Sequence, residues 1–166
     1  MPSPKFIFLL GALALALPAA ASAQVKTGDV FPSLAAAQLV GTVPDLAGKV
    51  AVVDFFASWC APCKASLPVY AKVHADYAAK GVVIVAVGID ETAALHDAFV
   101  KKLALPFPTP NDRAHKLVSI VQVPTMPTSY VLGRDGRVRY IHVGFHGADS
   151  EKALRQQLDT LLAEKN

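Results

Sequence analysis

The sequence is poor in cysteine, because its 166 residues hold only Cys60 and Cys63. Small secreted domains that rely on disulfides usually carry several well-separated bridges. A pair three positions apart closes too short a loop to stabilise the fold much. Charged residues are also few, at 17%, and the formal net charge is only +3. This mild, scattered charge gives no reason to expect nucleic acid or an anionic membrane surface as a partner.

Long apolar runs are equally scarce, and the one example lies near the N-terminus. Lys5 is followed by the uncharged stretch from Phe6 to Leu17, and Ala21-Ser22-Ala23 gives the small-x-small pattern that signal peptidase recognises. We expect residues 1–23 to be a secretory signal peptide cleaved after Ala23, which places the mature protein in the periplasm. The alternative is a retained membrane anchor, although a spanning helix needs about 20 apolar residues.

The remaining residues, 24–166, predict one α/β domain. Two continuous β-branched and aromatic runs, at 49–56 and 82–89, are typical of strands buried on both faces. A third and a fourth strand, at 128–132 and 138–143, flank the turn signal Arg134-Asp135-Gly136. Helices are expected at 61–79, 92–102, 113–120 and 150–163, and a short N-terminal strand pair at 28–32 and 34–40. The order predicts a three-layer mixed sheet flanked by helices, with a central helical insertion.

What the sequence does have is a C-x-x-C motif between the first long strand and the first helix. Cys60 lies where the helix begins, so its thiolate meets unpaired backbone N–H groups and the positive end of the helix dipole. Cys63 follows one turn later, within reach of a small disulfide. A dithiol of this kind can pass two electrons to the disulfide of another protein. The motif therefore predicts a thiol–disulfide redox protein.

These residues give a family resemblance. The run from Val53 to Lys64, with Trp59 before the first cysteine, resembles thioredoxin-fold proteins and more closely the exported TlpA/ResA-type thiol–disulfide oxidoreductases. Met126-Pro127-Thr128, followed by a hairpin, resembles the cis-proline strand of that fold. The resemblance covers nearly all of residues 24–166. It implies a thioredoxin-like fold and a protein-disulfide reductase.

The resemblance also implies roles for individual residues. Cys60 is expected to attack the substrate disulfide and Cys63 to resolve the mixed disulfide. Asp54 is expected to accept the Cys63 proton, because burial raises the pKa of a carboxyl group. Trp59 and the Met126-Pro127 segment, with a cis bond, are expected to contact the substrate. Alternatives stay open for two of them: Asp54 as a capping or salt-bridged strand end, and Trp59 as a core residue.

Two positions depart from the ResA-type pattern. Many members have asparagine where Asp54 stands and a glutamate where this chain has Ser66. The proton acceptor is therefore expected on the strand, as in thioredoxin. Between the cysteines, Ala61-Pro62 supplies no histidine to stabilise the thiolate, so the couple is expected to be reducing.

The implied partners are protein disulfides, such as the haem-binding cysteines of apocytochrome c, and a membrane electron donor. We expect a monomer without a cofactor. We also expect no metal site, because the histidines do not share a metal-ligand spacing with the cysteines. The histidines are His74, His96, His115, His142 and His146. Three alternatives remain. The first is a dithiol oxidase or isomerase. The second is a peroxidase-type antioxidant enzyme, although the sequence motif that usually surrounds the peroxidase cysteine is missing. The third is a copper-binding chaperone that uses both thiols as soft ligands.

Overall fold

The centre of the protein is a four-stranded mixed sheet in the order β2-β1-β3-β4. The computed structural model describes residues 24–164, so the expected signal peptide lies outside the described residues. β1 pairs parallel with β2 and antiparallel with β3, and β3 pairs antiparallel with β4. The predicted mixed sheet is confirmed, and its strands are β1 (Val50–Phe56), β2 (Val82–Gly88), β3 (Thr128–Leu132) and β4 (Val138–Val143).

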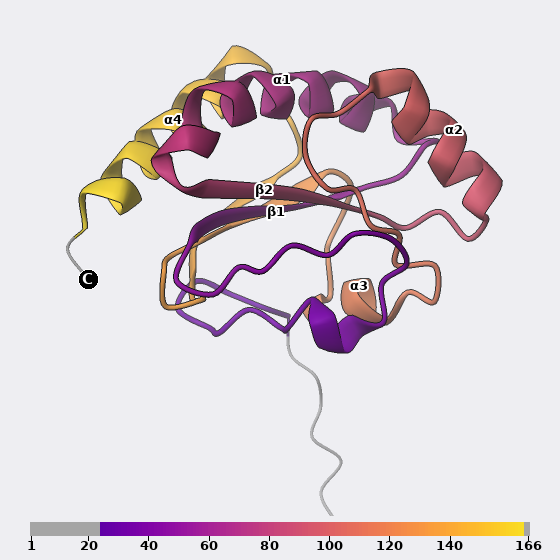
Figure 1. Ribbon diagram of the computed structural model, residues 1–166, viewed down its shortest axis with the longest axis horizontal. Coiled ribbons are helices and arrows are strands. Elements are labelled where there is room, and N and C mark those ends of the chain that lie inside the picture. The colour runs from indigo at the N-terminus through magenta and orange to yellow at the C-terminus, as the bar shows by residue number, and fades with distance from the viewer. Residues whose placement is uncertain (1–23, 165–166) are drawn as a thin grey trace, which may run out of the picture.

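Helices cover both faces of this sheet (Figure 1). On one side lie α1 (Ala61–Tyr77), α2 (Ala93–Leu103) and α4 (Ala148–Ala163). On the other side lie α3 (Lys116–Val121) and the N-terminal segment, which contains the short 3-10 helix η1 (Ala35–Ala37). A second 3-10 helix, η2 (Ala78–Lys80), directly follows α1. The three predicted layers are therefore present, and α2 is the predicted central helix.

Alternation along β1 divides the core into two apolar clusters, because successive side chains of a strand point to opposite faces. Val52 and Phe56 pack with Leu67 of α1 and Leu158 of α4. Their neighbours Val53 and Phe55 belong to the cluster on the other face, together with Leu117 of α3 and Tyr130 of β3. Every residue of β1 is buried, which fits the uninterrupted apolar run in the sequence.

The predicted N-terminal strand pair is wrong. The segments 28–32 and 34–40 do not pair with each other. Val30 forms a single bridge with Arg137, and Val40 forms one with Asn111. Both valines are mostly exposed, at 60% and 52%, so a longer ladder there would bury little apolar surface. Pro32 also lacks the N–H that a ladder requires.

The proline-rich stretch before α3 runs along the outer edge of β2. The backbone N–H of Ala86 donates to Pro108 O at 3.1 Å, and that of Gly88 donates to Pro110 O at 2.9 Å. Asn111 then exchanges backbone hydrogen bonds with Val40. The stretch belongs to neither a helix nor a strand of the structure, as its prolines predict.

Two side chains tie helices to the sheet region. Arg134, in the β3–β4 turn, donates from Nη1 to Leu161 O at 2.8 Å and from Nη2 to Leu162 O at 3.3 Å. These carbonyls belong to the last turn of α4, which otherwise leaves them without helical partners. His96 of α2 stacks on the Phe56 ring of β1 at 5.7 Å between centroids.

Within residues 24–164, no helix combines the length and apolar character needed to cross a membrane.

Candidate redox site

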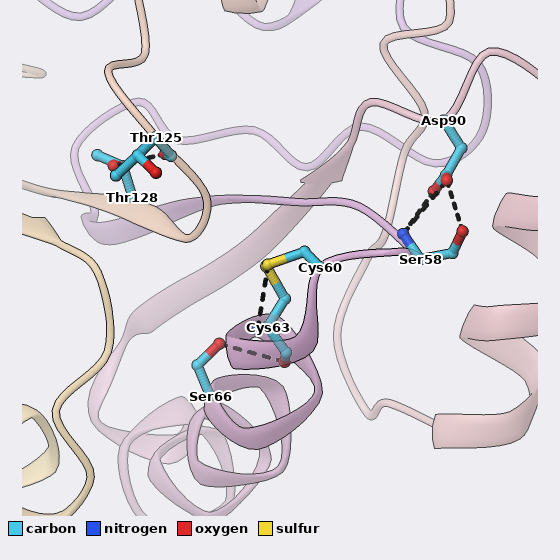
Figure 2. The surroundings of a disulfide bond; sticks show 7 residues. All are labelled: Ser58, Cys60, Cys63, Ser66, Asp90, Thr125 and Thr128. Atoms are coloured by element: carbon cyan, nitrogen blue, oxygen red, sulfur yellow. Dashed lines mark hydrogen bonds between the residues drawn. A yellow bond between two sulfur atoms is a disulfide. The ribbon is translucent and has the colours of Figure 1, made fainter.

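The two cysteines form a disulfide at the start of α1 (Figure 2). Cys60 is the N-cap residue, with extended backbone, and Pro62 occupies the first helical turn, where its missing N–H costs nothing. The backbone N–H of Cys63 donates to Cys60 Sγ at 3.2 Å. The Cys60 sulfur therefore occupies the place of a capping side chain, where a negative charge is stabilised by helix N–H groups.

The two sulfurs differ in accessibility. Cys60 keeps 4% of its surface exposed, whereas Cys63 keeps none. A substrate can thus reach Cys60 more readily than Cys63. Ser66 stands at the position where many ResA-type proteins have glutamate. It is fully buried, and its hydroxyl donates to Cys63 O at 3.3 Å. It offers a hydroxyl group and no carboxylate near the second cysteine.

The carboxylate of Asp90, which follows β2, holds the turn that precedes Cys60. Asp90, just after β2, accepts from the Ser58 hydroxyl at 2.6 Å and from the Ser58 backbone N–H at 3.1 and 3.2 Å (Figure 2). The sequence suggested Thr92 or Asp90 as the N-cap of α2 and no role for Asp90 at this site; the N-cap is Thr92. The available signal was an acid at the carboxyl end of a strand parallel to β1, because such ends meet at one edge of a sheet.

Asp54 lies in the middle of β1 and is completely buried. Its side chain points to the same face as Val52 and Phe56, the face that packs against Cys60, Cys63 and α1. Neither carboxylate oxygen has a hydrogen-bond partner, so Asp54 forms no salt bridge or cap among the described residues. Burial raises the pKa of Asp54 well above its ordinary value, and the nearby Tyr70 hydroxyl offsets part of that rise. The predicted raised pKa is confirmed.

Trp59 directly precedes Cys60, and the Met126-Pro127 segment leads into β3 at the end of the sheet where β1 ends. Trp59 is 67% exposed, which excludes the core alternative, and it lines a surface pocket with Ile89, Asp90 and Leu95. The Met126–Pro127 peptide bond is cis, as the resemblance implied. Met126 is partly buried against the cluster that contains both cysteines.

The loop that carries this cis bond is held at both ends. The Thr128 hydroxyl donates to Thr125 O at 2.9 Å (Figure 2), and Gly144 N–H donates to Pro127 O at 2.8 Å. The structure therefore brings the predicted site residues to one end of the sheet, with Asp54 beneath them. Among residues 24–164, no group of three or more histidine, cysteine or acidic side chains is placed to hold a metal ion.

Comparison with known proteins agrees with this geometry. The sequence profile of the AhpC/TSA family matches residues 27–141. The thiol-disulfide oxidoreductase ResA of Oceanobacillus iheyensis is 34% identical over 126 residues, which cover 72% of this chain and 66%, just under two thirds, of that relative.

Two solved structures are also similar. A provisionally assigned thiol:disulfide interchange protein DsbE from Chlorobium tepidum superposes with a TM-score of 0.78 at 32% identity, covering 84% of this chain and all of that one. A secreted Mycobacterium tuberculosis disulfide oxidoreductase, homologous to E. coli DsbE, gives 0.61 at 27% identity, covering 70% and 84%. The chain therefore belongs to the AhpC/TSA family and is a TlpA/ResA-type thiol–disulfide oxidoreductase of the thioredoxin superfamily.

Proposed function

We propose that this protein reduces protein disulfides by dithiol–disulfide exchange through Cys60 and Cys63. The observation that carries the proposal is the disulfide at the N-cap of α1, with its more accessible sulfur on Cys60. In the reduced protein, the N–H groups at the helix start stabilise the Cys60 thiolate. This thiolate attacks a sulfur of the substrate disulfide and forms a mixed disulfide, and the other substrate sulfur leaves as a thiolate.

Cys63 completes the reaction. It gives its proton to Asp54, attacks the Cys60 sulfur and displaces the second substrate thiolate, so that the substrate gains two electrons and the Cys60–Cys63 disulfide forms. Asp54 suits this role because it is buried on the side of the sheet where the cysteines pack, and because its raised pKa makes it a better proton acceptor than an ordinary carboxylate. No other carboxylate is buried on β1.

The substrate is proposed to bind across Trp59 and Met126. An exposed tryptophan beside a reactive sulfur offers apolar contact area to an incoming chain. We expect the backbone next to Pro127 to pair with an extended substrate segment, as in β-strand addition; the cis bond at Met126–Pro127 supports this role. The pocket formed by Trp59, Ile89 and Leu95 extends this surface on the side of α2.

We further propose export, with cleavage after Ala23 and a periplasmic site of action. The apolar run and the small-x-small motif of the sequence support export, and the similar Mycobacterium tuberculosis protein is described as secreted. A reductant in an oxidising compartment needs a membrane electron donor. Apocytochrome c, with its haem-binding cysteine pair, is the proposed client class.

The test is insulin reduction by the mature protein with dithiothreitol as donor. Cys60→Ser should abolish the activity, whereas Cys63→Ser should accumulate mixed disulfides that reducing agent releases. An unchanged rate in the Cys60→Ser protein would refute the proposal. A redox titration then fixes the direction: a potential near about −270 mV supports a reductase, and one near about −120 mV supports the oxidase alternative.

A further inference from the structure

The buried Asp54 has a hydroxyl group on the neighbouring strand. Ser129 of β3 lies directly opposite Asp54 in the antiparallel register. Residues directly opposite in such a pair project to the same face of the sheet. Ser129 is 1% exposed and Asp54 is fully buried, so neither side chain contacts bulk solvent.

A second hydroxyl group comes from α1. Tyr70 is buried, on the same helix face as Cys63 and Leu67, and its hydroxyl donates to Ser129 Oγ at 3.0 Å. Helical side chains lean toward the N-terminus of their helix, which here brings the tyrosine ring toward the end that carries Cys63. The two acids influence each other: the charge of Asp54 adds to burial in raising the pKa of Tyr70, and the Tyr70 hydroxyl opposes the burial-driven rise in the pKa of Asp54.

The Tyr70 hydroxyl hydrogen has two possible acceptors here, Ser129 Oγ and the Asp54 carboxylate. In the oxidised structure Tyr70 donates to Ser129, and both Asp54 oxygens are left without a partner. A neutral carboxyl group tolerates that situation at moderate cost. An ionised one does not, because a buried charge without hydrogen bonds is far more costly and charge-assisted hydrogen bonds are about twice as strong as neutral ones.

We propose that Tyr70 is a positioning residue for Asp54, and that its hydroxyl hydrogen turns from Ser129 Oγ to the Asp54 carboxylate whenever Asp54 is ionised. The inference rests on the proposed role of Asp54 as proton acceptor. Before resolution, Tyr70 holds the ionised Asp54. When the Cys63 proton moves to Asp54, the Tyr70 hydrogen returns to Ser129. The Tyr70 O–H bond never breaks, and the hydroxyl group only rotates.

Several other titratable groups on this side of the sheet form hydrogen bonds elsewhere. Tyr77 of α1 donates to Asp159 of α4, His142 of β4 pairs with Gln157, and His96 of α2 pairs with Thr109 O. The groups to consider besides Asp54, Tyr70 and the two cysteines are therefore His74, Tyr77, His96, Tyr140, His142, Arg155 and Asp159. On β2, the residue opposite Asp54 is Ala86, which does not titrate.

The test measures the pKa of the Asp54 carboxyl group by ¹³C NMR in the oxidised mature protein, where neither thiol titrates. Tyr70→Phe removes the Tyr70 hydroxyl donor and should raise this pKa. Ser129→Ala removes the competing acceptor and should lower it. Ser129→Thr keeps the hydroxyl group and should leave it unchanged. A purely structural role predicts that Tyr70→Phe and Ser129→Ala move the value in the same direction or not at all, and either result would overturn the proposal.

The same variants should shift the pH dependence of the reaction in the same directions as the pKa of Asp54. In single-turnover reduction of a mixed disulfide, the acid limb of the rate–pH profile should shift to higher pH for Tyr70→Phe and to lower pH for Ser129→Ala. Asp54→Asn distinguishes the proposed role of Asp54 from the proposed role of Tyr70. If that variant keeps the wild-type profile, the proposed role of Asp54 fails, whereas the NMR titration still decides whether Tyr70 controls its ionisation.

Discussion

Replacing Asp54 with asparagine should change how stability depends on pH. Asp54 is fully buried without a hydrogen-bond partner, and its pKa in the folded protein is raised well above the ordinary value. In the unfolded chain the same group titrates near about 3.9. Between these two pKa values the folded state binds more protons than the unfolded state, so the free energy of unfolding falls as pH rises.

The size of the effect follows from linkage. Each pH unit within that window lowers the free energy of unfolding by about 1.4 kcal/mol. Asparagine removes the titration, and its buried amide adds a cost of about 1–3 kcal/mol that does not depend on pH. The difference in slope between wild type and Asp54→Asn is therefore the diagnostic quantity. Above the folded-state pKa the two curves should run parallel.

The assay is urea denaturation of the oxidised proteins at about pH 5, 6 and 7. From pH 5 upward the variant should gain on the wild type by about 1.4 kcal/mol per unit until the native carboxyl group ionises. Asp135→Asn is the control of opposite sign, because the backbone N–H of Arg137 lowers the pKa of this exposed carboxyl group. Its stabilisation should be lost only as pH falls toward the acid range. Parallel curves for wild type and Asp54→Asn over the whole range would refute the reasoning.

Three further substitutions test the packing of the fold and the surface of the site. Gly88→Ala places a methyl group against the His96 ring and should destabilise the protein by about 1–3 kcal/mol in urea denaturation. Arg134→Ala removes the donor that satisfies the last carbonyls of α4 and should lower the melting temperature, with a cost of about 1 kcal/mol. Trp59→Ala should raise the KM for a protein disulfide several-fold, while changing the free energy of unfolding by less than about 0.5 kcal/mol because the ring is exposed.

Each of these has an internal check. The loss from Gly88→Ala should shrink when His96→Ala is added, since the clash is with that ring. Arg134→Lys keeps the charge but not the planar fork, so it should recover only part of the loss. For Trp59→Ala, an unchanged KM with insulin would show that the indole does not bind the substrate.

The sequence was sufficient for the four strands of the sheet and for the position of the cysteines. Both rest on local signals: an uninterrupted apolar run for β1, a turn motif between β3 and β4, and the C-x-x-C pair where α1 begins. The burial of Asp54 was predictable too, because an acid inside an apolar strand has no route to solvent.

The hydrogen-bonding partners of the site were not predictable in this way. Ser129 meets Tyr70 across 59 positions of sequence, and Ser58 meets Asp90 across 32. These contacts depend on the register of two strands and on the rotation of α1, which the apolar pattern alone does not specify. The N-terminal segment failed for a related reason. Its short apolar stretches suggested a strand pair, although each forms only one bridge with a distant partner.

The proline-rich stretch beside β2 has a consequence for self-association. An exposed sheet edge can recruit a strand from another molecule and start aggregation. Here the β2 edge is occupied by residues 108–112, and the backbone of Asn111, on the side away from β2, exchanges hydrogen bonds with Val40. The backbone groups of Asn111 are therefore not free to pair with a strand of another molecule. This cover should limit edge-to-edge aggregation at high concentration.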